Sequence, residues 1–144
     1  MLNIILDTNI LFSALAFDKH VEDLVRKVLD DYRNFTVWRS DETIFELQEK
    51  LTSKKFLDYR KFDLNQMQEL LDWYKLNTRF VEVTKKVTIC RDPSDNKFLE
   101  LAKAVKADYI ISGDKDLLEI SEFEDTRILK PSEFLREIGL RSLT

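Results

Sequence analysis

Short apolar runs recur along the chain and predict buried strands. The first covers residues 2–6, LNIIL, and a later one covers residues 109–111, YII. Short runs that are mostly apolar are typical of strands buried on both faces of a parallel sheet. Further β-prone segments lie at residues 35–38, 80–83, 87–89 and 128–129.

Apolar residues at helical spacing alternate with these runs. Residues 21–33 carry apolar side chains three and four positions apart with charged residues between them, which predicts an amphipathic helix. Further helices are predicted over residues 41–53, 63–78 and 95–107, and from Pro131 onward. Because strands and helices alternate, we predict an α/β fold with a mainly parallel sheet, from which helices 41–53 and 63–78 project as a hairpin.

The composition is that of one compact domain. The 144 residues are 44% hydrophobic and include only two glycines and two prolines, so we expect a single domain over residues 1–144. The apolar amino-terminal stretch is short and contains Asp7 and Asn9, which favours a core strand followed by a helix over a signal peptide or membrane span. A single cysteine, Cys90, excludes an internal disulfide and fits a cytoplasmic protein.

The net charge of −4 argues mildly against binding nucleic acid by bulk electrostatics, but not against an enzyme whose metal ions supply the positive charge. One basic segment, residues 54–62, could hold a single strand of RNA by phosphate contact and stacking on its aromatic residues. Packing of those aromatic residues at a helix corner is the more frequent outcome for such a segment. The basic residues concerned are Lys54, Lys55, Arg60 and Lys61.

Acidic residues follow two of the predicted core strands. Asp7 closes the first strand, Asp114 follows the strand at 109–111, and Asp95 begins the helix before that strand. Ligands of open parallel sheets bind beyond the carboxyl ends of the strands, so these acids are expected to meet there. Clustered carboxylates repel one another unless a cation compensates, and Mg²⁺ or Mn²⁺ suits such oxygen ligands. A pair of these ions can activate water and stabilise both oxygens of a phosphodiester displacement.

These motifs together resemble the PIN-domain family over nearly the whole chain. The resemblance rests on the strand that ends in Asp-Thr-Asn, on a glutamate in the second helical region, and on the segments RDPSDNKFLELA, ADYIISGDKDLL and ILKPSEFL. It is closest to bacterial and archaeal PIN proteins regarded as the toxins of toxin–antitoxin pairs. The resemblance implies a three-layer α/β/α fold and a metal-dependent endoribonuclease. It also implies a small antitoxin that blocks the cleft, and self-association into a dimer or larger oligomer.

The resemblance also assigns roles to residues. The four catalytic acids would be Asp7, Glu46, Asp95 and Asp114. The metal ligands would be Asp7, Asp95, Asp114 and Asp116, and either Asp114 or Asp116 could be the direct ligand at the end of its strand. Thr8, Asn9 and Ser112 would orient the carboxylates or the metal-bound waters. Glu46 is selected by the resemblance alone, because its position on the polar side of its helix is equally that of a solvated residue.

Structural interpretations of the same residues stay open at this point. Asp7 lies in a turn-forming tripeptide, and Asp95 is a good helix N-cap. Two other function classes are also open. A PIN scaffold without activity would fit the acidic net charge, and a phospho-receiver domain would fit Lys130-Pro131 after the last strand, although Thr8 stands where a receiver needs a second acid.

Overall fold

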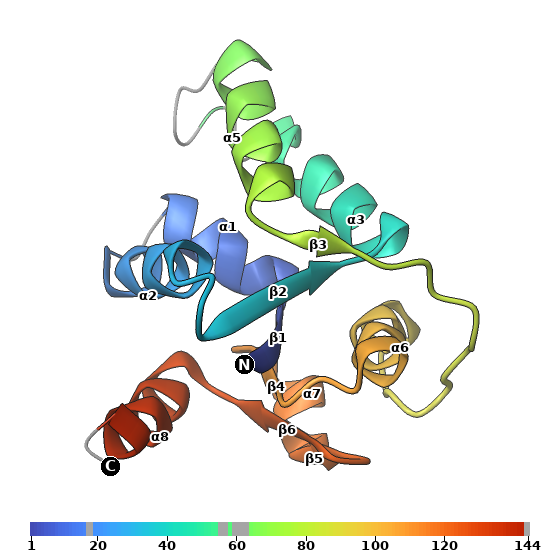
Figure 1. Ribbon diagram of the computed structural model, residues 1–144. Helices are drawn as coiled ribbons and strands as arrows, with labels where there is room; N and C mark the ends of the chain where they lie inside the picture. The colour runs from blue at the N-terminus through green and yellow to red at the C-terminus, as the bar shows by residue number, and fades with distance from the viewer. Residues whose placement is uncertain (17–18, 55–57, 59–63, 143–144) are drawn as a thin grey trace.

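The computed structural model describes residues 1–16, 19–54, 58 and 64–142 (Figure 1). Within these residues, six strands form one sheet in the order β3-β2-β1-β4-β6-β5. Every neighbouring pair is parallel except β5 and β6, which are antiparallel. The strands are β1 (Leu2–Leu6), β2 (Phe35–Arg39), β3 (Arg79–Phe80), β4 (Tyr109–Ile111), β5 (Glu122–Phe123) and β6 (Thr126–Leu129).

Helices connect these strands and cover both faces of the sheet (Figure 1). They are α1 (Thr8–Ala16), α2 (Lys19–Asp30), α3 (Asp41–Leu51), α5 (Leu64–Leu76), α6 (Asn96–Val105), α7 (Lys115–Ile120) and α8 (Pro131–Ser142), with a 3-10 turn at Pro93–Asp95. In the described part of the chain, no helix is long and apolar enough to cross a bilayer.

Successive side chains of β1 belong to two different clusters of the hydrophobic core. Ile4 and Leu6 belong to one buried cluster, together with apolar residues of α1, α2, α3, α5 and α8. Ile5 points to the other face, into a cluster formed with residues of α6 and α7. Successive side chains of a strand point to opposite faces, so both faces of this apolar strand are buried under helices. The predicted three-layer α/β/α fold with a mainly parallel sheet is confirmed.

The projecting hairpin consists of α3 and α5, which extend beyond the β3 edge of the sheet in Figure 1. Ser40 caps α3 with a reciprocal capping box to Thr43, which satisfies two backbone N–H groups that the first turn leaves free. At the same base of the hairpin, where α5 ends, the Arg39 guanidinium donates hydrogen bonds to the carbonyl oxygens of Lys75 and Thr78. The last strand residue of β2 therefore fixes the carboxyl end of α5.

Several element predictions need correction. Residues 87–89 do not form the strand that their composition predicted, because the Val87 N–H is bound by the Glu100 side chain, 2.9 Å away, and not by a neighbouring strand. The β-prone run at 80–83 contributes only the short β3. Helix α7 and strand β5 were not predicted, since six and two residues are too few for a periodic pattern.

Candidate active site

The carboxyl ends of β1 and β4 lie side by side, which brings Asp7 and Ser112 together. Leu6 is in register with Ile111, so the next residue of each strand leaves the sheet at the same edge. The Ser112 hydroxyl donates to Asp7 Oδ2 at 2.6 Å. Asp7 and Ser112 therefore lie together at the carboxyl edge of the sheet.

Asp7 is buried, with 1% of its surface exposed, and both of its carboxylate oxygens accept hydrogen bonds. Oδ2 accepts from Ser112 and Oδ1 accepts from the backbone N–H of Asn9 at 3.2 Å. Burial raises the pKa of Asp7, and these two hydrogen bonds act in the opposite direction. Thr8, the first residue of α1, is also buried.

Asp114 is the N-cap of α7. Its Oδ1 accepts from the backbone N–H of Asp116 at 3.1 Å, and its own N–H donates to the Ser112 hydroxyl at 2.9 Å. Ser112 thus links the cap of α7 to Asp7. The cap also sets the direction of the carboxylate, because the same side chain satisfies a free N–H group of the first turn.

Asp95 ends the 3-10 turn and precedes α6, but its side chain makes no capping hydrogen bond. The capping role falls to Asp92, whose Oδ1 accepts from the Ser94 backbone at 3.0 Å. Asp95 Oδ2 is buried and has no hydrogen-bond partner among the described residues. Burial and the neighbouring Asp114 carboxyl raise the pKa of Asp95 to about 8. A buried carboxylate oxygen without a donor is costly, so this atom is suited to a ligand.

Three carboxylates form a compact group at this edge. One oxygen each from Asp95, Asp114 and Asp116 lies within 4.8 Å of the others. Mg²⁺ and Mn²⁺ prefer such oxygen ligands, and a cation would remove both the mutual repulsion and the unpaired state of Asp95 Oδ2. The donor set therefore fits a hard divalent cation. Asp7 lies beside the group, and its charge contributes to the raised pKa of Asp95.

Glu46 lies on α3, outside the three-carboxylate group. Its Oε1 is 3.3 Å from Lys50 Nζ, and its Oε2 accepts a hydrogen bond from Lys97 of α6. Lys50 also donates to Asn9 Oδ1 at 2.5 Å, which connects this ion cluster to the turn after Asp7. The catalytic role that the resemblance implied for Glu46 stays a prediction.

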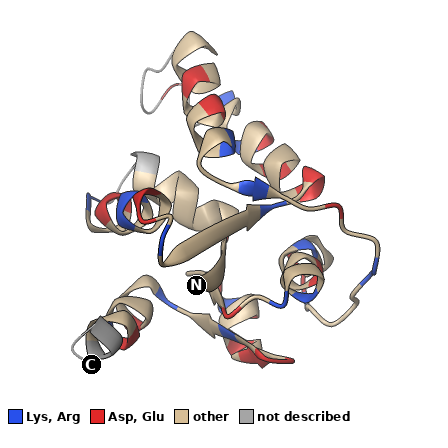
Figure 2. Ribbon diagram, viewed as in Figure 1, with Lys and Arg blue, Asp and Glu red and all other residues tan. Residues whose placement is uncertain are grey.

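The described residues cover only part of the basic segment that was predicted to bind RNA. Lys54 is exposed, while Lys55, Arg60 and Lys61 lie outside the described residues. Lys50 and Lys97 were not predicted, although the four-residue spacing of Glu46 and Lys50 and the position of Lys97 two residues after Asp95 were visible signals. Figure 2 shows basic and acidic residues mixed along α2 and α5.

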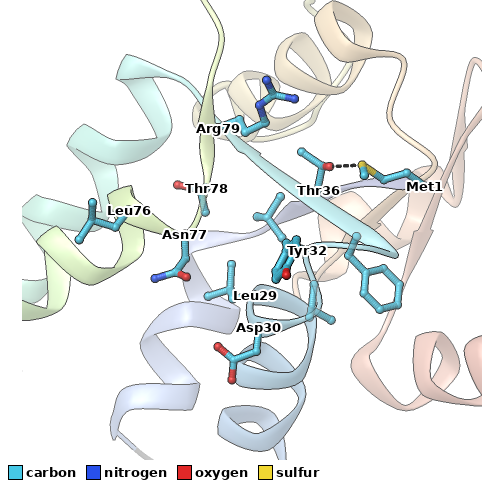
Figure 3. A pocket seen from close by; sticks show the side chains of 12 residues that line it. Met1, Leu29, Asp30, Tyr32, Thr36, Leu76, Asn77, Thr78 and Arg79 are labelled. Atoms are coloured by element: carbon cyan, nitrogen blue, oxygen red, sulfur yellow. Dashed lines mark hydrogen bonds between the residues drawn. The ribbon is translucent and has the colours of Figure 1, made fainter.

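Two pockets bear on the choice of site. A pocket of about 370 Å³ lies between α1 and α3, and its lining includes Asn9, Phe12, Glu46 and Lys50. The pocket in Figure 3, about 450 Å³, lies at the amino ends of β2 and β3. Asp30 is the one carboxylate that lines it among the described residues. The carboxyl edge is therefore the better candidate for metal-dependent chemistry.

Comparison with known families identifies the family of this chain. A family model described as PIN domain matches residues 3–116, a range that contains all the acids discussed above. The chain belongs to the PIN-domain family. An uncharacterized protein of Methanocaldococcus jannaschii is 26% identical to this PIN protein over 94% of the chain and 91% of its own length.

Two solved structures share the PIN fold at low sequence identity. VapBC2 from Rickettsia felis, bound to a DNA fragment from its promoter, superposes with a TM-score of 0.59 at 16% identity, covering 88% of this chain and 97% of that chain. FitAcB from Neisseria gonorrhoeae superposes with a TM-score of 0.58 at 17% identity, covering 90% of this chain and 98% of that chain. Identities this low establish the fold alone.

Proposed function

We propose that this PIN protein is a nuclease that hydrolyses phosphodiester bonds of RNA with the help of Mg²⁺ or Mn²⁺. The observation that carries the proposal is the carboxylate group of Asp95, Asp114 and Asp116, with its unpaired buried oxygen on Asp95. A site that is short of positive charge in this way favours a divalent cation together with a phosphate ligand.

The aspartates of the site have different roles in this proposal. Asp95, Asp114 and Asp116 would hold the cation, which would polarise the phosphate and lower the pKa of water. Asp7 keeps a fixed orientation because Ser112 and Asn9 each donate to one of its oxygens, so it would act by its negative charge and not as a mobile proton carrier. A cation held at this site would favour the carboxylate form of Asp95.

We further propose that the protein is a cytoplasmic toxin of a toxin–antitoxin pair. Support comes from the RDPSDNKFLELA and ILKPSEFL segments and from the shared fold with the PIN chains of VapBC2 and FitAcB. A small antitoxin would then cover the edge of the sheet where Asp95, Asp114 and Asp116 lie, called the acid edge below. The toxin would also self-associate. Expression of the wild-type chain should arrest bacterial growth, whereas expression of Asp95→Asn should not.

The direct test is cleavage of a fluorescent single-stranded RNA by purified protein with Mn²⁺ or Mg²⁺. We expect cleavage by the wild-type chain and at least about a hundredfold loss in Asp95→Asn and Asp114→Asn. Asparagine can still cap α7, so the second variant should fold. Asp125→Asn, at an exposed turn, is the matched control and should cleave at the wild-type rate. Equal cleavage by all four proteins would refute the proposed mechanism.

The alternative is a PIN scaffold that binds partners without cleaving RNA. The net charge of −4 is the observation that favours it. Calorimetric titration with Mn²⁺ separates the two functions, because a nuclease site should bind the ion and lose that binding in Asp95→Asn. A chain that neither binds Mn²⁺ nor gains thermal stability from it at millimolar concentration would be the scaffold.

A further inference from the structure

Two lysines from different helices converge on one carboxylate beside the acid edge. Lys50 of α3 and Lys97 of α6 each bind a separate oxygen of Glu46. Lys97 is 51 positions from Glu46 in the sequence, so the packing of α6 against α3 creates this cluster. A carboxylate that pairs with one lysine at each oxygen fixes the separation between the two ammonium groups.

The charges of this cluster do not cancel. Two lysines and one glutamate leave a net charge of +1 in the cluster, next to an edge of the sheet that is otherwise acidic. The position of the charge is tied to the active site, because Lys50 donates to Asn9, whose backbone N–H in turn binds Asp7. An anionic substrate that approaches the acids meets this positive charge, which offsets part of their repulsion.

The exposed fractions of Lys50 and Lys97 agree with a role of these side chains in binding a phosphate. The side chains of Lys97 and Glu46 are 21% and 18% exposed, and that of Lys50 is 34% exposed. Lys50 also lines the pocket between α1 and α3, together with Asn9. The lysines are thus partly buried and paired with Glu46, yet they remain within reach of a ligand. Ammonium groups held in place before binding lose less conformational entropy when they bind a phosphate.

We propose that Lys50 and Lys97 bind a backbone phosphate of the RNA next to the cleaved bond, and that Glu46 positions these lysines. This inference rests on the proposed function, and it assigns Glu46 a role different from metal ligation. Glu46 is then a positioning residue, while the lysines contact the substrate.

The first experiment measures binding of a fluorescein-labelled single-stranded RNA in EDTA, where cleavage does not occur. We expect the double variant Lys50→Gln with Lys97→Gln to bind about tenfold more weakly than wild type. The slope of log affinity against log salt should become shallower by about 1.4, at about 0.7 for each lost phosphate contact. The matched control is Lys103→Gln, which removes one positive charge from α6 at an exposed ion pair with Glu124. It should change neither quantity appreciably.

The second experiment separates positioning from metal ligation. Glu46→Gln should keep the Mn²⁺ affinity of the wild-type chain, and its RNA affinity in EDTA should fall by less than about threefold, because both lysines remain but are no longer held in place before binding. Its kcat should fall by about tenfold or more with little change in KM, because the phosphate is no longer held at a fixed place relative to the acids. Glu42→Gln, an exposed residue of the same helix, is the control. Lys97→Arg should retain RNA binding, because the charge is preserved.

Two results would overturn the inference. One is an affinity and salt slope for the double lysine variant equal to those of Lys103→Gln. The other is a loss of Mn²⁺ binding in Glu46→Gln as large as that in Asp95→Asn, which would make Glu46 a metal ligand. Neither measurement depends on cleavage, so a wild-type chain that fails to cut RNA would refute the proposed nuclease and leave this test intact.

Discussion

The hydroxyl of Ser112 donates to the carboxylate of Asp7 at 2.6 Å, across 105 positions of sequence. Both side chains are buried at the point where two adjacent parallel strands end. The same hydroxyl oxygen accepts from the N–H of Asp114, so one serine connects the first strand to the cap of α7. Loss of this hydroxyl should therefore affect stability and the acid edge together.

Ser112→Ala should lower the free energy of unfolding by about 1–3 kcal/mol, because it leaves a buried carboxylate oxygen and a backbone N–H without partners. It should also raise the pKa of Asp7 further, since the Ser112 hydrogen bond acts to lower it. Urea denaturation measures the stability. Ser132→Ala, at an exposed position of α8, is the control. Identical unfolding midpoints for the two variants would contradict the role given to Ser112.

The stability of the metal-free protein should fall as pH rises toward 8. The pKa of Asp95 is raised from 3.8 to about 8 in the folded state, so the folded chain holds a proton that the unfolded chain has released in this window. A state that binds more protons is favoured at lower pH, and its advantage is lost as pH increases through the folded pKa. The raised pKa of Asp7 acts in the same direction.

Urea denaturation in EDTA, from about pH 5 to about pH 8, tests this dependence. Asp95→Asn should show a flatter dependence than wild type, because asparagine does not titrate. Saturating Mn²⁺ should also flatten the wild-type curve, since the ion replaces the proton at the carboxylate group. Parallel curves for wild type and Asp95→Asn would show that Asp95 does not carry the effect.

Phe134 should be among the most sensitive core positions. Its side chain is fully buried between β-strand residues, with ring centroids 6.1 Å from Phe35 and 5.5 Å from Tyr109. Phe134→Ala should cost about 3–5 kcal/mol of unfolding free energy through lost burial and the cavity left behind. Leu135→Ala is the matched control, because Leu135 is 41% exposed on the same helix. A cost below about 1 kcal/mol at Phe134 would show that α8 does not need this contact.

Glu100 should hold the segment between β3 and the acid edge in place through its hydrogen bond to Val87. It is a buried residue of α6, and its Oε2 accepts from the Val87 N–H at 2.9 Å. Glu100→Ala should release this segment and speed tryptic cleavage after the exposed Lys85 and Lys86. Glu100→Gln keeps an acceptor oxygen and should be cleaved at nearly the wild-type rate. Equal rates of tryptic cleavage for Glu100→Ala and the wild-type protein would show that Glu100 does not hold this segment in place.

Local pattern was sufficient for the principal layers of the fold. The mostly apolar run of β1 predicted burial on both faces, and the helical spacing of apolar residues in α2 predicted one buried side. Local pattern failed at residues 87–89, because a distant side chain takes the hydrogen bond that a strand partner would have taken. It also missed α7, whose beginning depends on the cap that Asp114 provides.

The sequence by itself determined which residues could form an acid site, because Asp7 and Asp114 follow core strands whatever the details of packing. Only the tertiary structure decided how these acids differ. In the structure, each oxygen of Asp7 accepts one hydrogen bond, whereas one oxygen of Asp95 has no partner among the described residues. Glu46 is paired with Lys50 and Lys97. The physical reason is that a carboxylate's pKa and ligands depend on burial and on neighbours distant in sequence, which residue spacing does not contain.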